Sequence, residues 1–245
     1  MKKMYFWALF FSLSLFSQEK INQNEGQVWL GYMTSVKLNK DFSLWNDFHW
    51  ASDNFFIARH GITYHLSKQV AITGGYAWGY LSTTNSEKLS RNEQRPWAQI
   101  MFTSNLGEGW QTQQRVRYDA RFREKIANGE VVDGEYGFNH RLRYMFNIRK
   151  TLDGKPFNSQ STFLSLNNEI LVNFGKEITK NNLDQFRASL LLGKTYDNMT
   201  FQLGYMYRFV PQSAANTYKH YHGLTLWINH NFKSKKGTDE LIRDK

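Results

Sequence analysis

Arginine recurs at alternate positions in the middle of the chain, where guanidinium groups could bind carboxylates or other anions. Arg115 and Arg117 are two residues apart, and so are Arg141 and Arg143. In a β-strand this spacing places both side chains on one face. Arg is the residue that forms fixed, fork-shaped pairs with carboxylates, so we expect a polar face held together by such pairs. The expected members of this face are Arg59, Arg95, Arg115, Arg117, Arg121, Arg141, Arg143, Arg187, Arg208, Asp47, Glu93, Asp119 and Glu169.

Serine and histidine could supply hydrolytic chemistry, with a Ser nucleophile activated by a His on a neighbouring strand. No G-x-S-x-G or similar nucleophile context occurs among the 245 residues. Ser165 and Ser189 are expected on the polar face, but no His on that face is evidently paired with them. His49 and His65 are expected on the same face, where hydrogen bonding is their predicted role. We therefore predict no catalytic residue.

His220 and His222 flank Tyr221 at a spacing that could place two imidazoles on one strand face. Two His at a strand end are weak support for a metal site, and anchoring at an interface is the preferred interpretation. The chain contains no Cys, which excludes a thiolate metal site and a disulfide framework. No phosphate-binding Gly loop, zinc pattern or EF-hand loop occurs. The prediction is a non-enzymatic protein with no metal and no cofactor.

The elements that must position the arginines are strands, because apolar and polar residues alternate with period two down the whole chain. Each such run is longer than the five or six residues typical of globular strands, and suits a tilted membrane strand of about 9–11 residues. Eleven runs occur: 26–38, 41–51, 55–66, 69–81, 93–105, 110–123, 136–149, 161–174, 183–196, 199–209 and 219–232.

The connections between these runs alternate in length, as in outer-membrane barrels with short periplasmic turns and longer outer loops. The 150–160 connection is long where a short turn is expected. Single-chain bacterial barrels have even strand numbers, so we expect ten or twelve strands, with a run merged or split near residues 41–66. The predicted fold is all-β: a single transmembrane antiparallel up-and-down β-barrel. The longer loops are expected at 82–92, 124–135, 175–182 and 210–218.

The first residues predict export from the cytoplasm. Lys2 and Lys3 precede the apolar run Met4 to Phe16, and a cleavage position follows before Gln18. This run is shorter than the ~20 residues that span a bilayer, so residues 1–17 are expected to be a secretory signal peptide. The remaining segments are expected to be an N-terminal segment (18–25), one outer-membrane barrel domain (26–232) and a charged C-terminal tail (233–245).

The composition joins many rings to a polar average: 16% of residues are aromatic, while the mean hydropathy is −0.60. A barrel wall reconciles the two, with rings facing lipid and polar groups facing the interior. The net charge is +10, but the basic residues are spread singly, which argues against a nucleic-acid partner. The expected location is the outer membrane of a Gram-negative bacterium. Its lipids, lipopolysaccharide and the barrel-assembly machinery are the expected partners. Rings expected at the membrane surfaces are Tyr76, Trp78, Tyr80, Trp110, Tyr136 and Tyr221.

Several short motifs occur in a characteristic order. They are Asn92–Trp97 (NEQRPW), Arg115–Tyr118 (RVRY), Arg141–Tyr144 (RLRY), Asp184–Arg187 (DQFR) and Gly204-Tyr205. Over about residues 26–232 this order resembles the uncharacterised outer-membrane barrel family catalogued as domain of unknown function 2490. The resemblance implies a fold and a location, and it implies no activity.

Three functional hypotheses remain open. The favoured one is a non-enzymatic barrel with an Arg-rich, largely plugged lumen, because narrow barrels are filled by side chains. Since Arg exceeds acid, an anion-selective pore or a binder of anionic ligands is its alternative. The second hypothesis is an interfacial hydrolase of lipid or lipopolysaccharide. The third is a soluble periplasmic β-protein, with the apolar face turned inward. The oligomeric state is left open.

Overall fold

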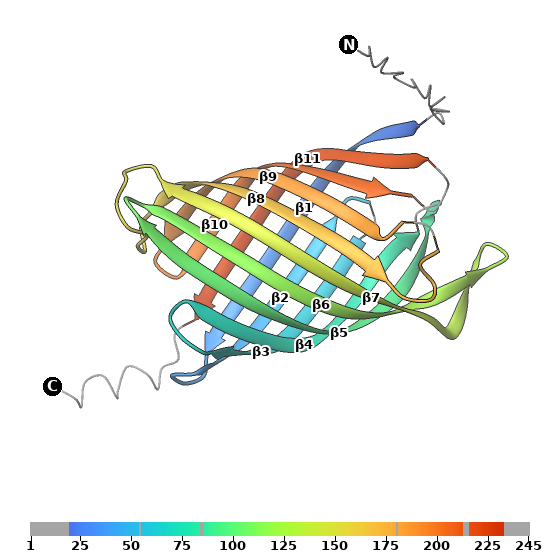
Figure 1. Cartoon of the computed structure of the whole chain (residues 1–245), viewed down its shortest axis with the longest axis horizontal. Helices are drawn as coiled ribbons and strands as arrows, with labels where there is room; N and C mark the ends of the chain where they lie inside the picture. Colours follow the sequence, from blue (N-terminus) through green and yellow to red (C-terminus); the bar gives the residue numbers. More distant parts are fainter. Residues whose placement is uncertain (1–19, 54, 84–85, 180, 213–215, 233–245) are drawn as a thin grey trace, which may run out of the picture.

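The computed structural model describes residues 20–53, 55–83, 86–179, 181–212 and 216–232. In this part of the chain eleven strands form one closed barrel, each beside its sequence neighbours (Figure 1). No helix there is long and apolar enough to cross a membrane. The expected signal peptide (1–17) and charged tail (233–245) lie outside the described residues. Most of the expected N-terminal segment belongs to the first strand, which begins at Ile21.

The strands follow the alternating runs of the sequence closely. They are β1 (Ile21–Lys37), β2 (Phe42–Ala51), β3 (Phe55–His65), β4 (Val70–Thr83), β5 (Ser86–Gly107), β6 (Trp110–Ala127), β7 (Glu130–Thr151), β8 (Thr162–Phe174), β9 (Leu183–Tyr196), β10 (Met199–Pro211) and β11 (Thr217–Phe232).

The expected count of ten or twelve strands is wrong, because the described residues form eleven. No run near residues 41–66 is merged or split: β2 and β3 are separate strands that pair from Phe42↔Tyr64 to Ala51↔Phe55. An up-and-down barrel with an odd number of strands brings its first and last strands together pointing the same way. Accordingly β1 and β11 close the barrel as a parallel pair, from Ile21↔Thr217 to Val36↔Phe232.

Two of the expected loops are also largely strand. The expected loop 124–135 is a hairpin in which β6 and β7 continue to pair as far as Ala127↔Glu130, and it projects beyond the barrel wall (Figure 1). Its turn has positive φ at both central residues, Asn128 (52°) and Gly129 (82°), as the tight hairpin turn requires. Likewise β4 and β5 extend into the expected loop 82–92. The sequence there has no clear apolar alternation, while the backbone groups still pair.

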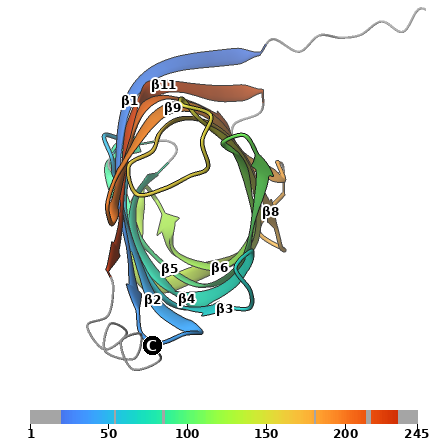
Figure 2. The ribbon, with the colours of Figure 1, turned by 90° about the vertical axis from the view of Figure 1, so that its left-hand side faces the viewer.

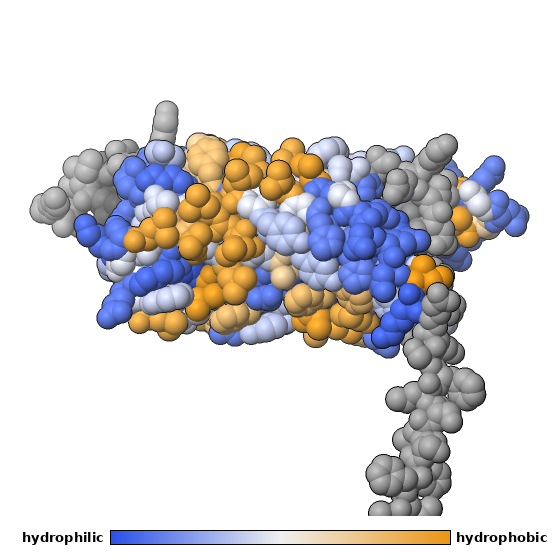
Figure 3. Space-filling view, turned by 90° about the horizontal axis from the view of Figure 1, so that it is seen from above, coloured by the Kyte–Doolittle hydropathy of each residue, from blue (hydrophilic) through white to orange (hydrophobic). Residues whose placement is uncertain are grey.

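The outer face of the wall is apolar. On β9, for example, Leu190 and Leu192 are 56% and 53% exposed, whereas Ser189 and Leu191 beside them are buried. Figure 3 shows apolar residues gathered in patches over the middle of the barrel, with hydrophilic residues toward both ends. The large apolar side chains of the wall therefore lie mostly on its outer face.

The rings expected at the membrane surfaces lie mostly on this outer face. Exposed rings include those of Tyr76, Trp78, Tyr80 and Trp110, and Tyr136 is half-buried. The expectation for Tyr221 is wrong, because this ring points inward and is only 8% exposed. The physical reason is its register: Tyr221 lies opposite Arg208 on β10, whose guanidinium carbon is 4.1 Å from the ring centroid.

Candidate functional site: the arginine-lined lumen

The barrel encloses a cavity of about 710 Å³ that runs along its length. Thr195 and Asn231 line it near the rim that carries the short turns. Ser82 and Gln212 line it near the opposite rim. Figure 2 looks along the barrel, where the strands surround this interior, here called the lumen. Because side chains alternate across a strand, every strand of the wall contributes half its residues to the lumen.

All thirteen residues of the expected polar face point into the barrel, from eight different strands. Arg115 and Arg187 keep the most accessible side chains of the set, each 16% exposed. The other eleven are buried: Asp47, Arg59, Glu93, Arg95, Arg117, Asp119, Arg121, Arg141, Arg143, Glu169 and Arg208.

Glu169 on β8 joins three guanidinium groups from three other strands. Its Oε1 is 2.6 Å from Nη2 of Arg115 and 2.7 Å from Nη2 of Arg143, and its Oε2 is 3.5 Å from Nη1 of Arg187. The first two distances are those of short, charge-assisted hydrogen bonds, and the third is within ion-pair distance. One carboxylate therefore ties β6, β7 and β9 to β8 inside the lumen.

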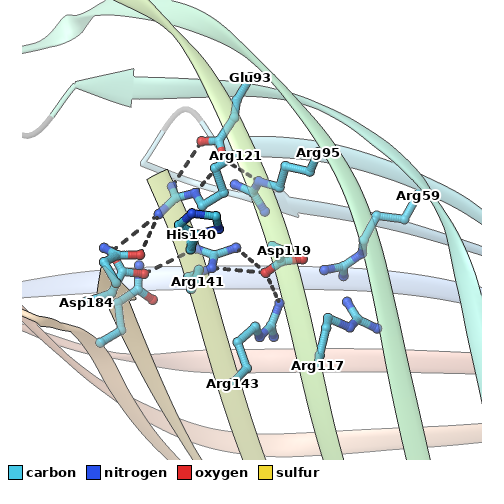
Figure 4. A network of polar contacts seen from close by, with 12 residues as sticks. Arg59, Glu93, Arg95, Arg117, Asp119, Arg121, His140, Arg141, Arg143 and Asp184 are labelled. Carbon is cyan, nitrogen blue, oxygen red and sulfur yellow. Dashed lines mark hydrogen bonds and ion pairs between the residues drawn. The ribbon is translucent and has the colours of Figure 1, made fainter. Parts of the chain in front are cut away.

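A second chain of ion pairs runs through Glu93, Arg121, Asp184, Arg141 and Asp119 (Figure 4). Arg121 Nε is 2.5 Å from Glu93 Oε1 and 3.7 Å, through Nη1, from Asp184 Oδ1. Arg141 bridges Asp184 Oδ2 at 3.1 Å and Asp119 Oδ2 at 3.0 Å. The chain is extended by further arginines at its ends: Arg95 contacts Glu93, and Arg143 lies 4.0 Å from Asp119.

Asp184 is a lumen residue that the alternation of the sequence did not reveal. By strict alternation with Arg187 it would face outward. The β8–β9 register shifts between Leu171 and Val172, which pair with Gln185 and Leu183, so that Asp184 is the extra residue of a bulge. A bulge re-aims one side chain. Its position just after a polar loop is the only sequence signal that could have suggested it.

Some lumen arginines have no carboxylate partner within 4 Å among the described residues. Arg117 donates two hydrogen bonds to the Gln99 amide oxygen, at 2.9 Å and 2.5 Å. Its guanidinium carbon also lies 4.6 Å from the Trp97 ring centroid and 5.5 Å from that of Trp45. Such cation–π contacts are worth about 0.5–2 kcal/mol each, less than a buried charge needs for full compensation.

Arg149 is a second arginine without a nearby carboxylate in the described part of the chain. It contacts the Gln111 side chain, and its guanidinium carbon lies beside two rings, 4.8 Å from the Phe157 centroid and 5.4 Å from the Phe163 centroid. Phe157 belongs to the connection 152–161, which is the long connection where a short turn was expected. Phe157 and Asn158 line the cavity, so this loop narrows the lumen at the short-turn rim (Figure 2).

Positive charge therefore exceeds negative charge along the lumen. Eleven Arg and Lys219 line the cavity, against four carboxylates: Asp47, Asp53, Asp184 and Glu169. Two further acids, Glu93 and Asp119, are fully buried and pair with lining arginines, so the excess is smaller than the lining alone suggests but stays positive. Asp53, Lys219, Arg91, Arg123 and Arg149 are lining residues that the expected set did not contain. They lie near the two rims, where the alternating pattern ends.

His49, one of the two histidines expected on the polar face, is held as a neutral imidazole. Trp29 Nε1 can only donate, and it lies 3.0 Å from His49 Nδ1, which must therefore accept. The ring proton then resides on His49 Nε2, 2.5 Å from Asp47 Oδ1. Both nitrogens are engaged, so this imidazole has no lone pair free to act as a base.

The expected inward serines have no histidine partner in the described residues. Ser165 Oγ accepts a hydrogen bond from Asn147 at 2.7 Å. A Ser–His contact that the sequence did not indicate joins Ser43 Oγ to His65 Nε2 at 2.8 Å. It lies beside the short turn between β1 and β2. No carboxylate contact to His65 is found in the described part of the structure.

The two histidines around Tyr221 point outward and not into the lumen. Their Nδ1 atoms contact neighbouring phenol groups: His220 is 2.7 Å from Tyr207 Oη, and His222 is 2.6 Å from Tyr205 Oη. Among the described residues, no group of three or more His, Asp or Glu side chains could hold a metal ion.

Comparison with known proteins identifies a family. The family model described as "Protein of unknown function (DUF2490)" matches residues 26–219. The chain belongs to this family. No curated protein matches the chain, and neither does any solved structure. The resemblance found in the short Arg and aromatic motifs is thus confirmed. The matched range of the DUF2490 chain contains all thirteen residues of the expected polar face.

Proposed function

We propose that this DUF2490 protein is a non-enzymatic outer-membrane β-barrel whose lumen attracts small anions and lets them pass. The observation that carries the proposal is the lining of the cavity, with twelve cationic side chains and four carboxylates along about 710 Å³. A cleft of one charge sign, enclosed by low-dielectric walls, raises the local concentration of counter-ions. Rings of Arg or Lys are the usual lining of anion pores.

The placement of charge and apolar surface supports a membrane location. In the proposed barrel, lipid would cover the exposed Leu, Tyr and Trp residues of the outer face, while the charged groups stay inside. Lipid-exposed backbone must be fully paired, and a closed barrel satisfies this requirement without edges. Together with the expected signal peptide, this supports export to the outer membrane, with lipids, lipopolysaccharide and the barrel-assembly machinery as partners.

A largely plugged lumen is the second candidate, and contacts across the interior favour it. Arg117 on β6 reaches Trp45 on β2, three strands beyond its neighbour β5. Arg208 on β10 pairs with Asp53, which follows β2, at 2.8 Å. These contacts narrow the passage. A plugged barrel would keep the same network and carry no current.

A hydrolase is the less favoured candidate. His49 has both ring nitrogens engaged, and the Ser43–His65 pair lacks a carboxylate partner among the described residues. A Ser nucleophile needs an oriented base beside an oxyanion site. The described residues supply no third group to orient His65, which supports a non-enzymatic role.

A pair of single substitutions tests the membrane location. Leu190→Arg places a charge on the outer face in the middle of β9, where Leu190 is 56% exposed. We expect the barrel refolded in lipid vesicles to lose about 2–4 kcal/mol of stability, as for Arg near a bilayer midplane. The control is Leu38→Arg, at a turn with 52% exposure, where the expected cost is about 0–1 kcal/mol. Equal and small costs at both positions would contradict membrane embedding.

Stepwise conductance in a planar bilayer tests passage through the lumen. The purified protein in symmetric potassium chloride is expected to give discrete current steps. Absence of current, from protein shown to be inserted, would reject passage and favour the plugged barrel. Current steps without any preference for chloride over potassium would reject only the anion part of the proposal.

A further inference from the structure

The lumen has two unlike walls. Nine of the eleven arginines that line the cavity lie on β5, β6, β7 and β9. The facing wall, formed by β1, β2, β3, β10 and β11, carries a large apolar surface. It includes Trp29, Met33, Trp45, Phe55, Met206 and Trp227, all of which line the cavity. A lumen serving only small hydrated ions has no need of such a wall.

The apolar wall has a packed centre at Trp29. This side chain is 2% exposed, and its ring centroid is 5.0 Å from that of Phe55 and 6.3 Å from that of Trp227. Trp29, Ala51 and Met206 form one buried apolar cluster with these rings packed against it. The rigid aromatic surface is therefore preformed inside the barrel.

Two arginine side chains contact this aromatic surface at Trp29. The guanidinium carbon of Arg187 is 4.7 Å from the Trp29 ring centroid, and that of Arg208 is 5.2 Å from it. Both arginines line the cavity. Two cationic groups from β9 and β10 thus border one indole that belongs to the apolar wall.

One of these two arginines, Arg208, is incompletely satisfied by the protein. Arg208 pairs with Asp53 through Nη2 at 2.8 Å, but its buried Nε has no hydrogen-bond partner. Arg187, by contrast, donates two hydrogen bonds to Gln185 Oε1, at 3.0 Å and 2.7 Å, and its Nη1 lies 3.5 Å from Glu169 Oε2. A buried donor without an acceptor costs about 1–3 kcal/mol, which a bound anion could relieve.

We propose that the site around Trp29 selects organic anions that carry an apolar, preferably aromatic, body. The inference rests on the proposed function and specifies the class of solute. The carboxylate or sulfonate head would contact Arg187 and Arg208, and the body would lie against Trp29 and its neighbouring rings. The cavity volume, about 710 Å³, is within the range of sites that hold small organic ligands.

Three probes distinguish the contribution of the arginine wall to binding from that of the apolar wall. Naphthoate has both the charge and the rings, acetate has only the charge, and naphthalenemethanol has only the rings. The full-length protein, refolded in lipid nanodiscs, is titrated with each by calorimetry, with empty nanodiscs subtracted. We expect the Kd of naphthoate to be at least about tenfold lower than that of either partial probe, since each of the others loses one type of contact.

Arginine variants test where in the lumen the carboxylate of naphthoate binds. Arg208→Gln is expected to weaken naphthoate binding about tenfold, and Arg149→Gln, which removes the same charge near the short-turn rim, less than about threefold. Lys125→Gln removes a charge from the exposed hairpin outside the lumen and is expected to leave binding unchanged. Each variant is used only if it shows the heat-dependent gel shift of a folded barrel. If Arg208→Gln does not refold, Arg187→Gln tests the same contact.

The outcomes distinguish this inference from the proposed function. If acetate binds as tightly as naphthoate, or if Arg149→Gln weakens binding as much as Arg208→Gln, the aromatic site is rejected while an anion-attracting lumen stands. If naphthoate fails to bind but the bilayer current prefers chloride, the aromatic site is rejected and the anion-preferring lumen stands. If naphthoate binds no better than naphthalenemethanol and the current shows no preference for chloride, both proposals fail.

Discussion

In the lumen, the acidic residues that contact several arginines at once contribute most to stability. Glu169 is 5% exposed and contacts three arginines, so its removal leaves three lumen cations with one partner fewer. Breaking a buried ion pair at one partner costs more than the pair contributes, because an uncompensated charge remains. The network is thus more sensitive to loss of an acid than to loss of any one Arg.

Glu169→Gln is therefore expected to lower the free energy of unfolding by about 3 kcal/mol, measured by urea titration of the refolded barrel. The matched control is Glu135→Gln, which breaks the Lys125–Glu135 pair on the hairpin. That pair spans 3.4 Å with side chains 52% and 59% exposed, so the expected cost is about 0–1 kcal/mol. Similar costs for the two variants would mean that the lumen pairs are as solvated as surface pairs.

Alternation in the sequence was sufficient to assign individual lumen residues where strands are regular. Arg115, Arg117, Arg141 and Arg143 needed only the period of two. It failed for Asp184, because a bulge on β9 turns that side chain inward. Some pairings were also beyond the sequence, because they join strands that are not neighbours in the chain. They are Arg115 on β6 with Glu169 on β8, and Arg121 and Arg141 with Asp184 on β9.

Among the elements, the parallel pair β1–β11 closes the barrel. The two strands approach each other closely at Gly223 of β11. A Cβ added to Gly223 would lie 1.6 Å from the backbone oxygen of Gln27, the residue opposite on β1. Backbone cannot move aside as a flexible side chain can. The seam therefore depends on Gly223 for close approach of its two strands.

Gly223→Ala is expected to destabilise the barrel by about 1–3 kcal/mol or more, as overpacking does, and to reduce the fraction that shows the heat-dependent gel shift after refolding. Gly26→Ala is the control on the same seam, since a Cβ there meets nothing within 4 Å. If the two variants refold equally well, β1 and β11 are not joined in this parallel register.

The position of the connection 152–161 leads to a separate prediction about the passage of ions through the lumen. Phe157 lines the cavity and packs on Arg149, so it narrows the short-turn rim. Phe157→Ala is expected to raise the single-channel conductance. Leu152→Ala, at a position 58% exposed on the same connection, should leave it unchanged. An unaltered conductance in the Phe157 variant would show that the narrowest point lies elsewhere.

Strand positions were largely predictable from the sequence, and the strand number was not. The eleven alternating runs correspond to the eleven strands, and the preference for an even number introduced the error. The 124–135 segment carries the Asn128-Gly129 signal of a tight hairpin, which would have identified its strand pairing. The odd count became physically acceptable only through the parallel closing pair, a long-range contact that alternation does not encode.

At the scale of the whole molecule, the protein turns its apolar surface outward and its charge inward. The outer face suits lipid, and the lumen carries an excess of arginine over acid. Composition already indicated this division, because 16% aromatic residues coexist with a polar average. Whether the interior conducts depends on the side chains that cross it, and these follow from tertiary contacts and not from composition.

The central claim is that the lumen prefers anions, and the reversal potential of the current tests it most directly. The protein is placed in a planar bilayer between unequal concentrations of potassium chloride. We expect a reversal potential displaced toward the equilibrium potential of chloride, and a smaller displacement for Arg208→Gln. A reversal potential at zero, or displaced toward that of potassium, would contradict an anion-preferring lumen.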